Sequence, residues 1–468
     1  MKLAINGGVP IRNVLFPSQN TVGVLEKDAV MRVLNSGLLT GYQGSWGPNF
    51  YGGPEVRALE EEWATKFGVC HAIACNSATS GLFIACGAVG MGYAIGNDSI
   101  GRKGGDAIVS PFSMTCSATA PMGWGTGVHF ADIERDYYCV RPDSVKELLT
   151  RMFNKKYSAV IAVSLFGQPY DAEAINAMAA EHGTYVIEDA AQAVGSTLTW
   201  EEEIGTVVNG FPETIKRTKY AGTLGDIGVF SFNLGKHLTC GEGGMIVTDD
   251  DELAMRCRLI MNHAEAVVND MHSKAEDAAI LSQQGLDRLF GFNLRLTEIN
   301  AAIVRVQLAK MDTLVKQRVD NVNYLVGKLK DIPCLEMPKV RDGATHSYYV
   351  LPLKYKNEVF YHHSDPNYEN GIAERLHRDK FVAAVKAELP AVKDRETEGV
   401  PIGCGYIRPI QNMPVFGRSL DETPECTRQW ADELIIIHRM FGPLASRKDL
   451  DDVANAFIKV WENREELL

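Results

Sequence analysis

One lysine stands where a predicted strand meets a glycine cluster, in the segment FSFNLGKHLTCGEGG at residues 230–244. By its surroundings, Lys236 could be a surface cation, a phosphate-binding group or a covalent catalyst. A free lysine with a pKa of about 10.4 is neutral at pH 7 about once in 2,500, a penalty of about 4.6 kcal/mol. A cationic, desolvating site lowers that pKa, and imine formation then keeps the nitrogen reactive.

Two glycine motifs lie in the chain, and neither has the spacing of a nucleotide site. GMGYAIG at 90–96 is one residue longer than the dinucleotide fingerprint, and it follows a predicted helix instead of opening one. GVFSFNLGK at 228–236 has too long a glycine spacing for a P-loop, and His237 replaces the magnesium-binding Ser or Thr. The NTPase type of phosphate-binding lysine is therefore excluded.

Two other segments supply polar groups at predicted strand ends. EDAAQA at 188–193 follows an apolar strand and places Asp189 at the carboxyl edge of a sheet, although Asp189 could equally cap the next helix. CNSATSG at 75–81 turns from strand to helix, where Ser77, Thr79 and free backbone N–H groups could hold a phosphate.

Pyridoxal phosphate requires this combination of groups. Its phosphate needs a helix N-terminus and hydroxyls, and Ser231 lies five residues before Lys236. Its aldehyde needs a lysine, and its ring nitrogen needs a carboxylate that keeps it protonated so that the ring can accept electrons. Together with Lys236, the polar segments therefore predict a covalent cofactor site.

The elements that must position these groups form an alternating series. Apolar runs separated by helix-like stretches, such as 171–183, predict a mostly parallel sheet with helices on both faces. We expect strands within 71–77, 106–110, 158–167, 184–195, 226–232 and 243–250. The segment 199–226 interrupts the series as either a surface excursion or a substrate-facing loop.

The later part of the chain has a different pattern. A long helical stretch at 296–331 places Ile299, Ile303 and Val306 on one face, and Pro333 follows it. A strand-like run at 346–355 and helical segments at 379–388 and 446–464 come next, while 362–371 reads as a polar, exposed loop. A length of 468 residues favours two domains. We predict an α/β domain at 1–265 and a smaller α+β domain at 266–468 with a long linking helix.

Composition narrows the function classes. The chain is 46% hydrophobic and 23% charged, with net charge −12, which argues against a nucleic-acid binder. It has no apolar run of membrane-spanning length and no signal-peptide core at its start. Ten scattered cysteines form no C-x-x-C pair, and His362 and His363 are adjacent, so we expect free thiols, a cytoplasmic location and no metal site.

The chain resembles the DegT/DnrJ/EryC1 aminotransferases, which have the fold-type I architecture of pyridoxal-phosphate enzymes. The resemblance runs from about residue 20 to the end. Its anchors are GYQGSWGPNFYGGPEVRALEEEWATKFGVCHAIACNSATSGL, SLFGQPYDAEAINAMAAEHGTYVIEDAAQAVG, GTLGDIGVFSFNLGKHLTCGEGG and GFNLRLTEINAAI. The ordered set is far more specific than any one motif.

The resemblance assigns roles by position. Lys236 would form a Schiff base with pyridoxal 5'-phosphate and move the proton between substrate Cα and the cofactor, with the pyridoxamine form as the intermediate. Asp189 would pair with the ring nitrogen, and Gln192 would lie against the ring or its 3-oxygen. Phosphate contacts would come from Ala78, Thr79 and Ser231, and from Asn293 of a partner subunit, which implies a homodimer with shared sites.

One position departs from the family pattern. The segment SPFSMTCSATA at 110–120 usually has an aromatic residue stacked on the cofactor ring, and by spacing Met114 stands there. A thioether can pack on a ring face. The alternative is that Phe112 turns inward to do so, and stacking stays open between the two.

The resemblance also implies the reaction. Family members aminate keto-sugars or keto-cyclitols with glutamate or glutamine as donor. The C-terminal segment GYIRPIQNMPVFG at 405–417 looks closer to the cyclitol and antibiotic-precursor branch. His346, Tyr406 and Arg408 are candidates for substrate contact, each with a packing role as the alternative. Related sugar dehydratases have histidine at the lysine position, so Lys236 favours transamination over dehydration.

Overall fold

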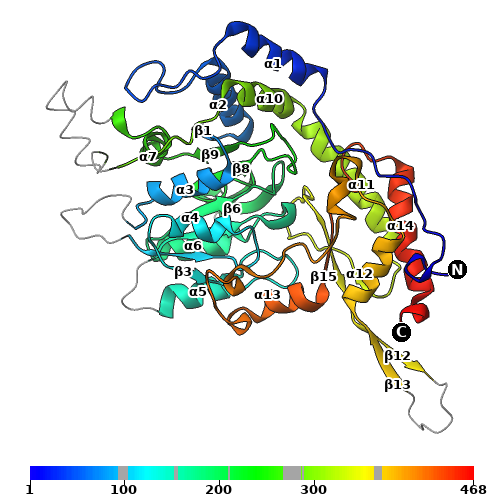
Figure 1. Cartoon of the computed structure of the whole chain (residues 1–468). Helices are drawn as coiled ribbons and strands as arrows, with labels where there is room; N and C mark the ends of the chain where they lie inside the picture. Colours follow the sequence, from blue (N-terminus) through cyan, green and yellow to red (C-terminus); the bar gives the residue numbers. More distant parts are fainter. Residues whose placement is uncertain (93–103, 152–156, 209–210, 267–285, 287–288, 363–371) are drawn as a thin grey trace. The chain divides into compact units, whose positions relative to one another are not determined.

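The computed structural model describes residues 1–92, 104–151, 157–208, 211–266, 286, 289–362 and 372–468 (Figure 1). The chain forms two compact units. The sheet unit comprises Val22–Asp312 and Val340–Ser347, and the terminal unit comprises Met1–Thr21, Thr313–Lys339 and Tyr348–Leu468. Within the described residues, no helix has both the length and the apolarity to cross a membrane.

The sheet unit is built on a seven-stranded sheet in the order β1-β9-β8-β5-β4-β2-β3. Strands β8, β5, β4, β2 and β3 are mutually parallel, and β9 is antiparallel to both of its neighbours, β8 and β1. The mostly parallel sheet is therefore confirmed. The strand bounds are β1 His71–Cys75, β2 Asp106–Val109, β3 Val128–Phe130, β4 Tyr157–Val163, β5 Tyr185–Asp189, β8 Ile227–Ser231 and β9 Gly244–Thr248.

Helices pack on the sheet. Helix α3 contacts α4, α7 and the strands β8 and β9, while α4 contacts β2 and α7 contacts β1 (Figure 1). Helix α6 contacts α5 and β5. Gly81 of α3 packs directly on β8, because a Cβ at this position would lie 2.7 Å from Val229 Cγ1. The helix bounds are α3 Ala78–Ala88, α4 Cys116–Met122, α5 Pro142–Arg151, α6 Ala172–Glu181 and α7 Asp251–Met261.

The predicted long helix is interrupted. A turn at Lys310 divides it into α10, Glu298–Ala309, and α11, Met311–Leu329. Helix α10 contacts α1, Val24–Ser36, and α2, Pro54–Phe67 (Figure 1). Ile299 and Val306 pack there against Ala29, Val33 and Ala302, so part of the predicted apolar stripe is buried.

The segment that interrupts the strand series forms a two-stranded antiparallel hairpin, β6 Thr197–Val208 and β7 Phe211–Tyr220. Its base is bonded to the segment 341–345: Thr199 N donates to Gly343 O at 2.8 Å, and Thr345 N donates to Thr197 O at 2.8 Å. The sequence did not indicate these strands, because their charged and threonine-rich faces lack an apolar alternation.

The terminal unit contains a four-stranded sheet in the order β10-β11-β15-β14 and a separate hairpin of β12 and β13. The bounds of these strands and of the helices beside them are β10 Leu335–Glu336, β11 Leu351–Tyr355, β12 Glu358–His362, β13 Ile372–Leu376, β14 Ile402–Gly403, β15 Leu434–Ile437, α12 Arg378–Ala387, α13 Pro424–Arg428 and α14 Arg447–Glu462. The expected polar loop falls largely on residues 363–371, outside the described part of the chain.

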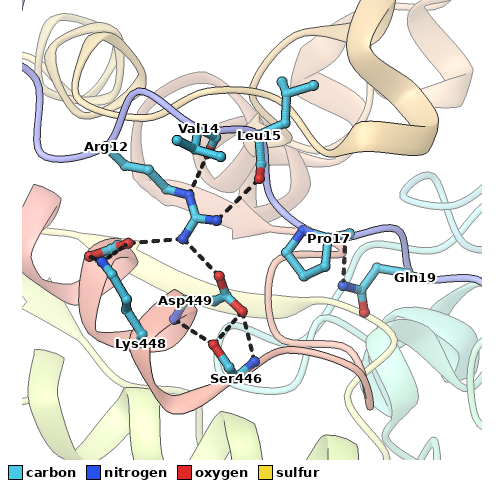
Figure 2. Close-up of polar contacts among 9 residues, drawn as sticks. Arg12, Val14, Leu15, Pro17, Gln19, Ser446, Lys448 and Asp449 are labelled. Carbon is cyan, nitrogen blue, oxygen red and sulfur yellow. Dashed lines mark hydrogen bonds and ion pairs between the residues drawn. The ribbon is translucent and has the colours of Figure 1, made fainter.

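The N-terminal segment belongs to the terminal unit, so the units divide the chain elsewhere than at the expected boundary of residue 265. Arg12 Nη1 lies 2.7 Å from Asp449 Oδ1 and 2.9 Å from Asp452 Oδ2 of α14 (Figure 2). The buried pair Lys459–Glu388, 2.8 Å apart, holds the same segment, since Glu388 accepts hydrogen bonds from Ala4 N and Ile11 N. Contacts spanning more than 370 residues attach this segment, and local sequence pattern does not reveal them.

Candidate active site

The carboxyl edge of the sheet gathers the predicted groups. Strands β1, β5 and β8 all end at this edge, because β1 runs parallel to the others by way of the antiparallel β9. Ser77 follows β1, Asp189 is the last residue of β5, and Ser231 is the last of β8. Lys236 lies in the connection from β8 to β9, in a turn where its N–H donates to Asn233 O at 2.9 Å. Parallel topology thus places distant segments together.

Asp189 is a buried carboxyl group with defined donors. It is 4% exposed. Its Oδ1 accepts from Ala191 N at 3.1 Å, and its Oδ2 accepts from Ser117 Oγ at 3.2 Å. Burial raises the pKa of Asp189 above its ordinary value, while the Ala191 N–H, the charge of Lys236 and the Ser117 hydroxyl oppose that rise. Lys236 is therefore close enough to Asp189 for its charge to act on the carboxyl group.

Cys116, the first residue of α4, lies in the same group. Burial and the charge of Asp189 raise the pKa of its thiol to about 11, opposed by a hydrogen bond with Thr79 and by the charge of Lys236. The thiol therefore stays protonated at neutral pH and is a poor nucleophile. Its interactions connect Thr79 at the start of α3 with Asp189 at the end of β5 and with Lys236 in the β8–β9 connection.

The N-terminus of α3 has the form of an anion site. Ser77 is the N-cap, and its Oγ accepts from Ser80 N at 3.1 Å, so that hydroxyl serves the helix. The N–H groups of Ala78 and Thr79 belong to the first turn, where no intrahelical acceptor exists. Gly244 lies against this turn, since a Cβ there would be 2.7 Å from Ala78 N. The GEGG sequence therefore permits close approach of β9 to the helix start.

Gln192 and two histidines are buried in the sheet unit. Gln192 is buried, and its Oε1 accepts from Phe166 N at 3.0 Å. His237 is also buried, with Nε2 3.0 Å from Ser347 O, so it is directed at a backbone group beside the site. Burial lowers the pKa of His346 to about 3, which keeps this imidazole neutral at physiological pH.

The two candidates for ring stacking differ in accessibility. Phe112 is fully buried, with its ring edge-on to Phe166 at a centroid separation of 6.1 Å. Met114 is 53% exposed and lies between β2 and α4 at the same sheet edge. The exposed thioether of Met114 is available to a ligand, whereas Phe112 is part of the core.

Three other candidates are divided between the two units. Asn293 is exposed in the sheet unit, and its Oδ1 accepts from Arg295 Nε at 2.9 Å. Tyr406 and Arg408 belong to the terminal unit, which is described separately. Arg408 is exposed there, and the backbone oxygen of Tyr406 accepts from Trp430 Nε1 at 3.2 Å.

Sequence reasoning missed a hydroxyl relay behind Asp189. Ser113 Oγ lies 3.1 Å from Ser117 Oγ, and Ser117 Oγ donates to Asp189. Both serines are buried. The available signal was position, because SPFSMTCSATA follows β2 and so starts at the same sheet edge as Asp189.

These residues fit pyridoxal phosphate. The start of α3 offers backbone donors for a phosphate, with Gly244 leaving space that a side chain would fill. Asp189 offers a buried carboxyl group, and Lys236 offers an amine whose charge acts on it. Among the residues that the structure describes, no group of His, Cys, Asp and Glu side chains could hold a metal ion. Fold and edge chemistry together are those of the fold-type I pyridoxal-phosphate transferases.

Comparison with known proteins identifies the family. A family model described as the DegT/DnrJ/EryC1/StrS aminotransferase family matches residues 42–458. The spore coat polysaccharide biosynthesis protein SpsC of Bacillus subtilis (strain 168) is 30% identical over 346 residues, which cover 73% of this chain and 76% of that protein. GDP-perosamine synthase of Vibrio cholerae is 29% identical over 310 residues, 66% of this chain and 72% of the relative.

A solved structure agrees. DesI, determined in the presence of its TDP-sugar product, has a TM-score of 0.72 at 24% identity, with 99% of this chain and 97% of that chain covered. At this identity the likeness establishes the shared fold. The chain belongs to the DegT/DnrJ/EryC1/StrS aminotransferase family and is a pyridoxal-phosphate-dependent aminotransferase.

Proposed function

We propose that the protein transfers an amino group from glutamate or glutamine to a keto-sugar or keto-cyclitol, in the synthesis of an amino sugar or aminocyclitol. The observation that carries the proposal is the gathering of Lys236, buried Asp189 and the start of α3 at the carboxyl edge of the sheet. The names of SpsC and GDP-perosamine synthase support a carbohydrate acceptor. The resemblance of residues 405–417 supports a cyclitol equally.

The residues of the edge would hold the cofactor in a fixed orientation. Lys236 would bind it covalently, and Asp189 would keep its ring nitrogen protonated. Ala78 N–H, Thr79 and Ser231 would bind its phosphate at the start of α3. Gln192 and the exposed Met114 would contact the two sides of its ring, while Ser77 keeps the helix start in place through Ser80.

When bound, pyridoxal phosphate supplies an electron sink that allows the Cα–H bond of an amino acid to break. The amine of Lys236 would accept the proton from the donor's Cα and return it to the carbon that receives the amino group. Asp189 supports this chemistry because an ionised carboxyl group in a buried place strongly favours a cation beside it. His237 is directed at Ser347 O, which favours Lys236 as the proton-transfer group.

The remaining parts of the proposal concern substrate, assembly and location. His346 in the sheet unit, and Tyr406 and Arg408 in the terminal unit, would contact the ketone. Asn293, which is exposed, would reach the phosphate in a partner subunit, which makes the active form a homodimer with shared sites. All ten cysteines are free thiols, which supports a reducing, cytoplasmic compartment.

The test follows the cofactor. Borohydride reduction of the yellow protein, followed by peptide mapping, should fix the cofactor on Lys236. A Lys236→Ala variant should lose the fixed label, whereas Lys216→Ala, on the exposed hairpin strand β7, should keep it. Adding glutamate or glutamine should convert the protein to the pyridoxamine form, and a screen of nucleotide-linked keto-sugars and keto-cyclitols should restore the original spectrum. A label on another residue, or no spectral return with any ketone, would refute the assignment.

A further inference from the structure

A cavity lies beside the β6–β7 hairpin in the sheet unit. Its volume is about 590 Å³, within the range of about 300–1,000 Å³ typical of small-molecule sites. The lining combines two aromatic rings, Tyr137 and Trp200, with charged side chains. The charged residues are Asp171, Glu173, Lys219, Arg341 and Asp342.

This cavity is distinct from the cofactor site. Consecutive residues of a strand face opposite sides of the sheet, so Glu188 points away from Asp189. Glu188 Oε2 accepts from Leu224 N at 3.0 Å, and Leu224 O accepts from Asn176 Nδ2 of α6 at 2.6 Å. Leu224 and Asn176 both line the cavity. It therefore lies on the α6 face of β5, whereas Asp189 faces Ser117 of α4.

The hairpin wall of the cavity is a fixed structure. In the β6–β7 register, Leu198 is opposite Lys219 and Trp200 is opposite Arg217, so these side chains share one face. The base of that wall is bonded to the segment 341–345. Gly343, with φ of +72°, comes so close to Thr199 O that a Cβ would lie 2.1 Å from it. The interruption in the strand series therefore builds one side of a cavity.

The charges of the lining disfavour phosphate. Arg341 is already paired with Asp171 at 3.2 Å and with Glu134, and its guanidinium lies 4.4 Å from the centre of the Tyr137 ring. Within the described part of the chain, Glu173, Lys219 and Asp342 have no ion-pair partner. Two open carboxylates against one open ammonium leave the lining negative overall, which favours a neutral or cationic ligand.

We propose that this cavity binds a polyhydroxylated ring without phosphate, preferentially one that carries an ammonium group. Trp200 provides an apolar ring face for the C–H side of such a ring. Glu173, Asp342 and Lys219 provide acceptors and donors for its hydroxyls and its ammonium. An amino sugar or aminocyclitol is the product class of the proposed function, on which this choice of ligand rests, but binding requires no transamination.

Calorimetric titration of the cofactor-loaded protein tests the site. D-glucosamine, at a pH where its amine is protonated, should bind saturably and more tightly than D-glucose or myo-inositol, and D-glucose 6-phosphate should bind most weakly. Trp200→Ala should weaken glucosamine binding about tenfold, because it removes the ring face. Lys216→Ala is the matched control, since Lys216 is opposite Glu201 on the other face of the hairpin.

Charge variants keep the test decisive even where Trp200→Ala fails to fold. The double variant Glu173→Gln, Asp342→Asn changes two exposed side chains and should abolish the preference for glucosamine over glucose, whereas Glu181→Gln on the same helix α6 should retain it. Lys236→Ala, which removes the proposed transamination, should still bind glucosamine. Absence of saturable binding, tighter binding of the 6-phosphate, or a preference unchanged by the double variant would overturn the proposal.

Discussion

Replacing Ser117 by Ala probes the group that we expect to hold the cofactor ring. Asp189 has two recorded donors, Ser117 Oγ and Ala191 N, and the substitution removes the first. A hydrogen bond to a charged group contributes about 1.5–3 kcal/mol. Since one pKa unit corresponds to about 1.36 kcal/mol, the pKa of Asp189 should rise by about one to two units. The carboxylate, which pairs with the ring nitrogen in the proposed function, would then become protonated at a higher pH than in the wild type.

The assay is cofactor affinity as a function of pH. Stripped protein is titrated with pyridoxal phosphate, and the dissociation constant is measured from the visible absorbance. As the pH falls, the affinity for pyridoxal phosphate should decrease in both proteins. The decrease should start at a pH about one to two units higher in Ser117→Ala than in the wild type. Ser117→Thr, which keeps a hydroxyl, should restore the original profile, and Ser113→Ala should shift it less because Ser113 contacts only the relay. An unchanged profile for Ser117→Ala, with its fold intact, would refute the reasoning.

Three further substitutions test the scaffold. Gly244→Ala should lower cofactor affinity at least about tenfold in the same titration, because its Cβ would meet Ala78 N at 2.7 Å and displace the start of α3. His346 has a pKa of about 3 in the folded protein and about 6.5 when unfolded, so acid favours unfolding. In urea unfolding, the unfolding free energy of the wild type should fall between pH 6.5 and pH 5. In His346→Gln this fall should be smaller by about 2 kcal/mol. Arg12→Ala should lower the unfolding free energy by about 3 kcal/mol, because Asp449 loses its cation and Asp452 keeps only Lys448. The exposed Lys448→Ala should cost less than about 1 kcal/mol.

The sequence predicted those parts of the fold that local pattern determines. The buried strands around Cys75, Asp189 and Ser231 have apolar runs, and the strand-end rule then places their polar neighbours at one edge. Prediction from the sequence failed where contacts between distant residues determine the structure. Ser117 is an ordinary helix residue until β2 and β5 bring it to Asp189. Arg12 looks like a surface cation until α14 supplies its two carboxylates (Figure 2).

The end of β5 joins the two proposed sites through consecutive carboxyl groups. Asp189 faces α4, and Glu188 faces the opposite side, where it accepts from Ser164 Oγ at 2.6 Å and from Leu224 N at 3.0 Å. Burial, with a smaller contribution from the charge of Asp189, raises the pKa of Glu188 to about 7. Leu224 in the cavity wall is thus hydrogen-bonded to the residue that precedes Asp189 on β5. The cavity and the cofactor site are therefore built on the two faces of one strand.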